Sequence, residues 1–184
     1  MAEAKTGKQA WIDAAVGALA AGGVEAVRVE RLARALGVTK GSFYWHFADR
    51  GALLESVVDA WEAAGTEAVI AAVEAGGGDA RARARALWAQ TSGDDNLTAE
   101  LALRDWGRRD PAIAARIQRV DNRRMGYLRS LLGELFGDTD DIEAKAMLLY
   151  SLLIGNYFIA AKHGRRSRRR VLRDAVELLL GPEA

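Results

Sequence analysis

A helical spacing of apolar residues runs through this 184-residue chain and restricts what it can fold into. Ile12, Val16 and Leu19 recur at intervals of four and three residues, which places them on one face of an α-helix. The same spacing returns in later segments, and strand-like alternation is not sustained over any useful length. Proline occurs only twice, so few positions interrupt a helix. The pattern predicts an all-α fold.

Glycines divide the pattern into segments. Gly22 with Gly23, Gly37, and the run from Gly76 to Gly78 each follow an apolar stripe, as glycines do where helices end. Asp110 before Pro111 has the arrangement expected at a helix start. Nine helices are predicted, over residues 8–21, 29–36, 40–46, 50–74, 80–92, 97–107, 111–136, 140–163 and 167–180.

Residue composition argues against an enzyme or a metal site. The chain has no cysteine, which excludes disulfides, thiol nucleophiles and zinc sites built on cysteine. Its two histidines, His46 and His163, are far apart and lack metal-ligand spacing. No glycine-rich phosphate loop and no Ser-His-Asp context occurs. We therefore expect neither catalysis nor a cofactor.

The longest apolar run favours a buried helix over a membrane span. It covers the 16 residues from Ala146 to Ala161, between Lys145 and Lys162, whereas a membrane span needs roughly 20 residues. The first eleven residues contain no apolar run long enough for a signal peptide. We therefore expect a cytoplasmic protein with no membrane partner.

The segment from Arg28 to Leu54 carries the most information about function. Gly37 is expected to turn the chain after one helix, and Thr39 to cap a second, short helix. Asp49 is expected to cap the helix that follows. Phe43 and Phe47 are four residues apart, so they share the face that anchors this helix to the core. The residues left outside are Lys40, Gly41, Ser42, Tyr44, Trp45 and His46.

Two short helices joined by a tight glycine turn describe a helix-turn-helix, whose second helix suits the major groove of DNA. Lys, Ser, Thr and Tyr side chains donate to phosphates, and hydroxyl and aromatic groups reach base edges. Bulk charge does not carry this argument, because the net charge is only +1 and residues 1–50 contain seven Lys or Arg against five Asp or Glu. The alternative is a helical protein-interaction bundle without DNA binding, in which the exposed aromatics are ordinary surface.

The sequence GVTKGSFYWHFADRGALL closely resembles the signature of TetR-family (tetracycline-repressor-like) transcriptional regulators. The resemblance covers roughly residues 8–54. It implies three N-terminal DNA-binding helices, a long linking helix, a divergent ligand domain and dimerisation through the last two helices. The expected domains are residues 1–49 for DNA binding and 50–184 for effector binding and dimerisation. The expected function is a homodimeric repressor released from a palindromic operator by a small-molecule effector.

The resemblance also implies roles for individual residues. Lys40, Tyr44, His46 and Arg50 would touch the DNA backbone, and the residues at or near base edges would be Thr39, Gly41, Ser42 and Trp45. Arg28 departs from the pattern, because the family usually has a Ser or Thr there that caps the helix and touches phosphate. An arginine can reach a phosphate but cannot accept a hydrogen bond at a cap. Arg50 stands where lysine is commoner.

Large side chains on inward helical faces are the candidates for an effector pocket, with plain core packing as the alternative: Trp61, Trp88, Trp106, Met125 and Tyr127. Arg124 falls on an apolar stripe, where a buried cation needs a partner. That partner is expected to be an acidic residue such as Asp105, or else an anionic effector. A third interpretation lets Arg124 extend to the surface.

The helix predicted over 140–163 is apolar nearly all round, so it must be covered on two sides. A second subunit is expected on one of them, and Gly155 would permit close backbone approach. The predicted dimer interface consists of Leu148, Leu152, Gly155, Ile159, Val176 and Leu180. The stretch from Arg165 to Arg170 is interpreted as a solvated loop and helix start, with contact to nucleic acid as the alternative.

Overall fold

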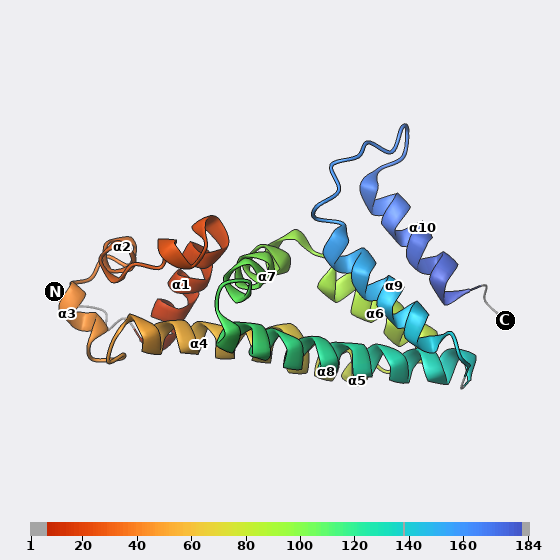
Figure 1. Cartoon of the computed structure of the whole chain (residues 1–184), viewed down its shortest axis with the longest axis horizontal. Coiled ribbons are helices and arrows are strands. Elements are labelled where there is room, and N and C mark those ends of the chain that lie inside the picture. The colour runs from red at the N-terminus through yellow and green to blue at the C-terminus, as the bar shows by residue number, and fades with distance from the viewer. Residues whose placement is uncertain (1–6, 138, 182–184) are drawn as a thin grey trace. The chain divides into compact units, whose positions relative to one another are not determined.

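The computed structural model describes residues 7–137 and 139–181, which form two compact units. The first comprises the described residues of Met1–Ala68 together with Gly93–Val120, and the second comprises Val69–Ser92 with those of Asp121–Ala184. Every regular element in this described part of the chain is helical (Figure 1), which confirms the all-α prediction. The units are defined by packing, so the functional boundary predicted after residue 49 stays a prediction.

The helices follow the predicted order closely. Their bounds are α1 Lys8–Gly22, α2 Val29–Ala35, α3 Lys40–Phe43, α4 Arg50–Glu62, α5 Ala68–Gly76, α6 Ala80–Thr91, α7 Asp94–Gly107, α8 Pro111–Phe136, α9 Ile142–Gly155 and α10 Arg168–Leu180. A short 3₁₀ turn, η1, covers Val24–Ala26. At the start of α8, the Asp110 carboxylate accepts from the backbone N–H groups of Ala112 (3.0 Å) and Ile113 (3.4 Å), as the Asp-Pro pair predicts.

Three predicted helices differ from the structure. The helix predicted over 40–46 ends at Phe43, and residues 44–46 form a turn. The helix predicted over 50–74 is divided into α4 and α5 by a π-helical turn, η2, at Ala63–Glu67, which periodicity over a long window does not reveal. The helix predicted over 140–163 ends at Gly155. Beyond it, the Arg168 guanidinium donates to the carbonyl oxygens of Asn156 (2.7 Å) and Ala161 (3.3 Å). These carbonyls therefore bond to a side chain, and the apolar run past Gly155 was wrongly interpreted as helix.

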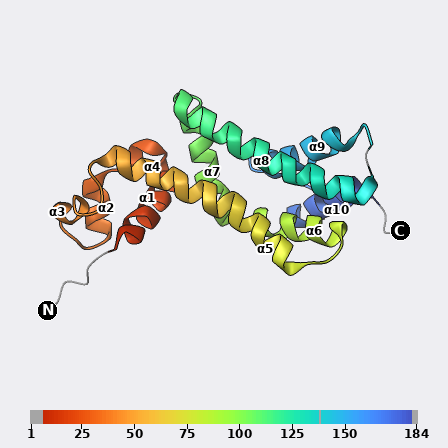
Figure 2. The ribbon, with the colours of Figure 1, turned by 90° about the horizontal axis from the view of Figure 1, so that it is seen from below.

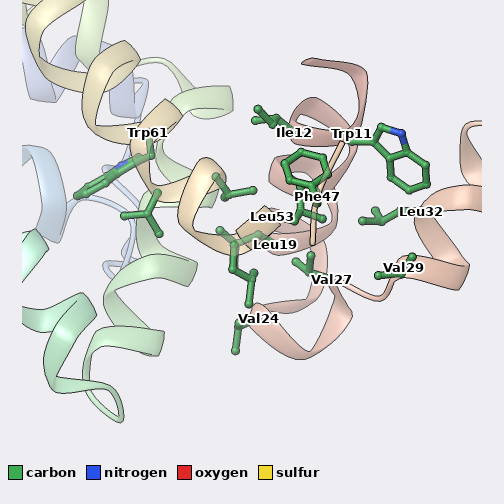
Figure 3. Packing of buried hydrophobic residues seen from close by; sticks show 14 of the residues in the cluster. Trp11, Ile12, Leu19, Val24, Val27, Val29, Leu32, Phe47, Leu53 and Trp61 are labelled. Carbon is green, nitrogen blue, oxygen red and sulfur yellow. The ribbon is translucent and has the colours of Figure 1, made fainter. Parts of the chain in front are cut away.

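The first unit is built around one face of α1. Trp11, Ala15 and Leu19 are fully buried there, at the four-residue spacing of a helix face. Figure 3 shows side chains of α1, the α3–α4 connection and α4 converging on one core, with Trp11, Phe47 and Leu53 labelled. Figure 2 shows α1, α2 and α3 grouped around the start of α4. This packing fixes the position of α3.

The second unit has its own apolar core. Leu131 and Leu132 of α8, Ala146 of α9 and Leu180 of α10 are almost fully buried in it. Helices α9 and α10 are neighbours (Figure 1). The Arg83 side chain of α6 forms ion pairs with Glu74 of α5 (3.2 Å) and with Glu134, so a polar network joins three helices at the edge of this core. Within the described residues, none of the helices combines the length and apolarity needed to cross a membrane.

Candidate nucleic-acid interface

The turn between α2 and α3 depends on Gly37. Its φ of 69° lies in the left-handed region, which glycine adopts with the least strain. The Gly37 N–H donates to the Arg34 carbonyl (3.2 Å) and the Val38 N–H to the Ala33 carbonyl (2.9 Å). Together these bonds form a Schellman motif, which satisfies the last carbonyls of α2. The chain therefore reverses tightly into α3, as the sequence predicts.

The start of α3 differs in one detail from the prediction. Thr39 occupies the N-cap position with extended φ and ψ, but its side chain makes no cap hydrogen bond. Instead, the Ser42 Oγ donates to the Thr39 carbonyl oxygen at 3.0 Å. The hydroxyl of Ser42 is therefore occupied within the helix, whereas that of Thr39 lies on the exposed side.

Aromatic packing anchors α3 to the first unit. Phe43 is fully buried and Phe47 nearly so, as their four-residue spacing predicts. The Phe43 ring meets Trp11 edge-on and stacks on Phe47, each with ring centroids 5.3 Å apart. Such pairs stabilise a core beyond the area that they bury. One face of the short helix is therefore fixed, and the opposite face is presented outward.

The outward face of α3 and the turn after it carry large aromatic side chains. Trp45 is 86% exposed and Tyr44 is 57% exposed. The His46 ring is half-buried and lies edge-on to Phe47, with centroids 6.5 Å apart. Exposed aromatics gathered in this way are typical of a contact surface. Gly41 is exposed, so the backbone of α3 is accessible beside them.

Lys40 forms an ion pair with Glu30 of α2, with 2.5 Å between Nζ and Oε1. This hydrogen bond raises the pKa of Lys40 and lowers the pKa of Glu30. Both side chains are more than half exposed, so solvent screens the attraction. The Lys40 ammonium is thus held at the surface between α2 and α3, where an anion would compete with Glu30 for it.

Arg28 and Arg50 bond to the backbone near η1. The Arg50 Nε donates to the Val27 carbonyl (2.7 Å) and its Nη2 to the Val24 carbonyl (2.5 Å). Arg28, at the N-cap of α2, makes no side-chain cap and donates from Nε to the Glu25 carbonyl (3.1 Å). Arg50 therefore ties the start of α4 to the segment before α2. The predicted contacts of both arginines with DNA stay predictions.

Sequence reasoning missed two cations on α2. Arg31 and Arg34 are exposed, and with Arg28 they follow a three-residue spacing that puts them on neighbouring positions of one helix. This spacing in the sequence could have identified the two arginines as exposed cations beside Arg28. The predicted cap of α4, by contrast, is confirmed, because the Asp49 carboxylate accepts from the Ala52 N–H at 2.8 Å.

A charge cluster connects α4 to α8 inside the first unit. The Arg116 guanidinium forms ion pairs with Glu62 (2.7 Å), Asp59 (2.5 Å) and Glu55 (2.9 Å). The hydrogen bond with Glu62 is the largest cause of the raised pKa of Arg116. Helix α4 directly follows the helix-turn-helix. This cluster therefore connects the start of α8 to the helix that comes next after α3. The helical periodicity of the sequence does not indicate these ion pairs.

The predicted effector residues divide between the two units. Trp61 is buried in the first core, where its Nε1 donates to the buried Glu100 at 3.3 Å, and Trp106 packs against the same core. Met125 and Tyr127 are buried in the second core, and Trp88 packs against it. The Tyr127 hydroxyl donates to Glu74 (2.5 Å), and burial followed by this bond raises the pKa of Tyr127.

Arg124 has a different partner from the one predicted. It is half-buried, and its Nη1 donates to the Tyr150 hydroxyl (3.2 Å), which in turn donates to Asp121 (2.6 Å). Asp105 instead pairs at 2.8 Å with Arg109, which lies just past the end of α7. The suggestion of Asp105 is therefore wrong, because the Asp105 carboxylate is paired with Arg109 and the Arg124 guanidinium donates to the nearby Tyr150 hydroxyl.

The residues predicted to form the dimer interface differ in how far they are exposed. Leu148 and Ile159 are exposed, and Leu152 and Gly155 are half-buried. Val176 and Leu180 are buried in the core of their own subunit, so they have almost no surface to offer a partner, and their assignment to an interface is corrected. The apolar stripe on α10 was assigned to the dimer interface although it faces the core of the subunit, because periodicity identifies an apolar face but not what covers it. Exposed apolar residues that sequence reasoning missed are Met147, Phe158 and Leu178.

Comparison with known sequences finds relatives of the helix-turn-helix segment. Residues 12–57 match the family model described as bacterial regulatory proteins, tetR family. Over 57 residues, 31% of this chain, the sequence is 42% identical to TtgW, an uncharacterized HTH-type transcriptional regulator of Pseudomonas putida. Over the same length it is 40% identical to SrpR, another HTH-type transcriptional regulator of that species. The match covers 42% and 27% of those relatives, less than half of each.

Solved structures share the fold over nearly the whole chain. A structure from Rhodococcus sp., described as a TetR-family transcriptional regulator, has a TM-score of 0.71 at 22% identity and covers 95% of this chain and 98% of its own. The fatty acid degradation regulator FadR from Bacillus halodurans has a TM-score of 0.68 at 19% identity, covering 98% and 97%. Both curated relatives that match this segment are named as transcriptional regulators. Residues 12–57 therefore carry the helix-turn-helix of the tetR family of bacterial regulatory proteins, and the chain as a whole shares the fold of these solved structures.

Proposed function

We propose that this protein is a DNA-binding transcriptional regulator that inserts α3 into the major groove of its operator. The observation that carries the proposal is the division of α3 into a buried aromatic face and an exposed face with Tyr44 and Trp45. A recognition helix needs this division, because the buried side fixes its orientation and the exposed side meets the DNA. The tetR-family match over residues 12–57 supports the same role for the segment.

Contacts of two kinds are proposed for the exposed face. Lys40, Tyr44, His46 and Arg50 would bind phosphates and so set the register of the protein on the duplex. The residues proposed to lie at or near base edges, where sequence is read, are Thr39, Gly41, Ser42 and Trp45. Arg28 is proposed to reach a phosphate from the start of α2, beside the exposed Arg31 and Arg34.

Replacing Tyr44 or Lys40 with alanine is expected to weaken operator binding without unfolding the protein, because both side chains are exposed. Loss of the Lys40 cation should reduce the steepness of log K against log salt concentration by about 0.9, whereas loss of the uncharged Tyr44 side chain should lower the affinity and leave the slope unchanged. The measurement is operator affinity over a series of salt concentrations, with a thermal melt of each variant. The operator itself would be obtained by selecting bound fragments from a genomic library.

Glu30→Gln provides the matched control for Lys40. This variant removes the carboxylate that now holds the Lys40 ammonium, so operator affinity should rise slightly where it falls in Lys40→Ala. Operator affinity that is unchanged in both the Tyr44 and the Lys40 variant would remove α3 from the role of recognition helix and favour a protein-interaction bundle.

A small-molecule effector is proposed to release the protein from its operator, as expected of a repressor. Arg116 supplies a route, because it connects α8 to three carboxylates on α4 within the first unit, and α4 directly follows the helix-turn-helix. An effector that moves α8 would therefore move α4. Such release requires that the effector bind more tightly to the conformation that does not bind DNA.

Effector binding is expected to change tryptophan fluorescence, since Trp61, Trp88 and Trp106 all lie in or against the cores of the two units. Operator DNA should weaken effector affinity by the same factor by which the effector weakens operator affinity, because linkage is reciprocal. The measurement is a fluorescence titration with and without operator. Equal effector affinity in both titrations would exclude release by the effector and favour constitutive or co-repressor control.

A homodimer is proposed to form through α9 and α10. In the single subunit, Met147 and Leu148 of α9 and Leu178 of α10 are exposed apolar side chains, and large exposed apolar patches are typical of interaction sites. A closed two-fold interface is the commonest way to pair identical chains. It implies a palindromic operator whose half-sites lie roughly 34–36 Å, or a multiple of one helical turn, apart.

A further inference from the structure

A dense run of cationic side chains lies between α9 and the first turns of α10. Residues 162–173 contain one lysine and six arginines and no Asp or Glu. Arg165, Arg166, Arg169 and Arg170 are all exposed, and these four residues are called the arginine surface below. The sequence interpretation left it open whether this stretch is merely solvated or contacts nucleic acid.

Only one arginine of the run has a clear structural role. Arg168 is half-buried and donates to the carbonyl oxygens of Asn156 and Ala161 and to the Asn156 side chain. The start of α10 is capped separately, because Ser167 Oγ accepts from the Arg170 N–H at 3.3 Å. The fold at this point therefore requires Arg168 and Ser167, and it does not explain the arginine surface.

Acidic neighbours do little to neutralise these charges. Asp174 lies 3.7 Å from Arg170 and 3.9 Å from Arg173, so one carboxylate serves two guanidinium groups at long range. Among the residues that the structure describes, no carboxylate lies within ion-pair distance of Arg165, Arg166 or Arg169. The local positive charge is thus left for solvent or for an external anion.

The position of the arginines also opposes helix stability. Arg169 and Arg170 lie in the first turn of α10, where the positive end of the helix dipole disfavours cations. Arg169 and Arg173 are four residues apart on the same helix, and like charges at this spacing repel each other. The arginine surface therefore does not stabilise the subunit, and its placement favours a role in binding an anion.

We propose that the arginine surface is a second nucleic-acid contact, which binds the phosphate backbone without reading sequence. Guanidinium groups bind phosphates through two parallel hydrogen bonds, and four exposed ones within residues 165–170 suit a polymer with regularly repeated phosphates. The choice of nucleic acid over other polyanions rests on the proposed function, since binding to an operator holds DNA at high effective concentration around the whole protein. The proposed contact would strengthen non-specific binding, which is almost entirely electrostatic.

The test compares two variants of the full chain that change net charge equally. R165Q/R169Q removes two members of the arginine surface, and R108Q/R119Q removes two exposed arginines elsewhere. Affinity for a short duplex without the operator is measured over a series of salt concentrations. The plot of log K against log salt concentration should become less steep by about two units in R165Q/R169Q, at about 0.9 per lost phosphate contact. In the control it should change by much less. Equal slopes in the two variants would overturn the proposal.

Two further probes distinguish other polyanions. Binding to vesicles of phosphatidylserine and phosphatidylcholine, and to polyglutamate, is measured with the same two variants. If R165Q/R169Q lost vesicle or polyglutamate binding while its DNA slope matched that of the control, the partner would be a membrane surface or an acidic protein, and the proposal would be wrong. Sedimentation of both variants shows whether the arginines act through the dimer, in which case the affinity would fall without a change in slope and the proposal would again be wrong.

The failure of this proposal is distinguishable from failure of the proposed function. Tyr44→Ala and Lys40→Ala test α3 with operator DNA, whereas R165Q/R169Q is tested with DNA that lacks the operator. An effect of the arginine variant with no effect of the α3 variants would refute α3 as recognition helix and leave the second contact standing. The opposite pattern would refute the second contact alone.

Discussion

Replacing Phe43 with alanine is expected to lower the free energy of unfolding of the first unit by about 3–5 kcal/mol. The ring is completely buried and contacts the rings of Trp11 and Phe47, each at 5.3 Å between centroids. Its removal would leave a cavity between α1 and α3 that the rigid aromatic neighbours cannot fill. Because α3 contains only the residues Lys40–Phe43, it depends on this anchor more than a long helix would.

Loss of the anchor should abolish operator binding as well as stability. A recognition helix contributes only when its outward side chains are held in a fixed orientation, and Phe43 is the buried end of α3. The measurements are a thermal melt and operator affinity at a temperature where the variant is folded. Tyr44→Ala is the matched control for the melt alone, because Tyr44 is the adjacent aromatic residue but is exposed, and because this variant is itself expected to bind operator less tightly. A Phe43→Ala melt that overlays that of the parent would contradict the buried face assigned to α3.

The helix-turn-helix was predictable because local chemistry determines most of it. A glycine with positive φ, two phenylalanines at four-residue spacing and an aspartate cap are each visible in the sequence, and each has the predicted role at Gly37, Phe43, Phe47 and Asp49. These features act over a few residues, so no knowledge of distant contacts is needed. The same holds for the start of α8 at Asp110.

Features that depend on distant contacts were not predictable. The carbonyl oxygens that Arg50 binds, those of Val24 and Val27, are more than twenty residues away, and Arg116 meets its carboxylates across 54 to 61 positions of sequence. A long cationic side chain has many possible partners, and spacing alone does not choose among them. The partner of Arg124 was missed for the same reason, since Tyr150 lies on another helix.

The end of α9 shows how apolar composition can mislead. Residues after Gly155 are apolar and continue the run from α9, yet they leave the helix, and Phe158 and Ile159 are exposed in the subunit. A single-chain pattern cannot separate side chains buried in their own core from those covered by a partner. The same ambiguity placed Val176 and Leu180 in a predicted interface, although the subunit's own core buries them.

Exchanging Leu148 for glutamate is expected to dissociate the proposed dimer. Leu148 is 55% exposed in the single subunit and lies beside the exposed Met147 on α9, so the substitution should leave the subunit folded. In a two-fold interface the new carboxylate would be buried once in each subunit, and an unpaired buried charge is strongly unfavourable. Leu152→Glu is a less clear probe, because Leu152 packs against the core of its own subunit.

Dissociation should in turn weaken operator binding by a large factor. Two linked recognition helices bind as one unit, and separating them removes an avidity gain on the order of 10²–10⁴-fold. The measurements are sedimentation at micromolar concentration and operator affinity, with Gln118→Glu as a control that adds the same charge at an exposed position on α8. A Leu148→Glu protein that stays dimeric and binds operator as tightly as the control would place the interface on another surface. A parent protein that sediments as a monomer would refute the dimer itself, and a single α3 would then have to provide all of the specificity.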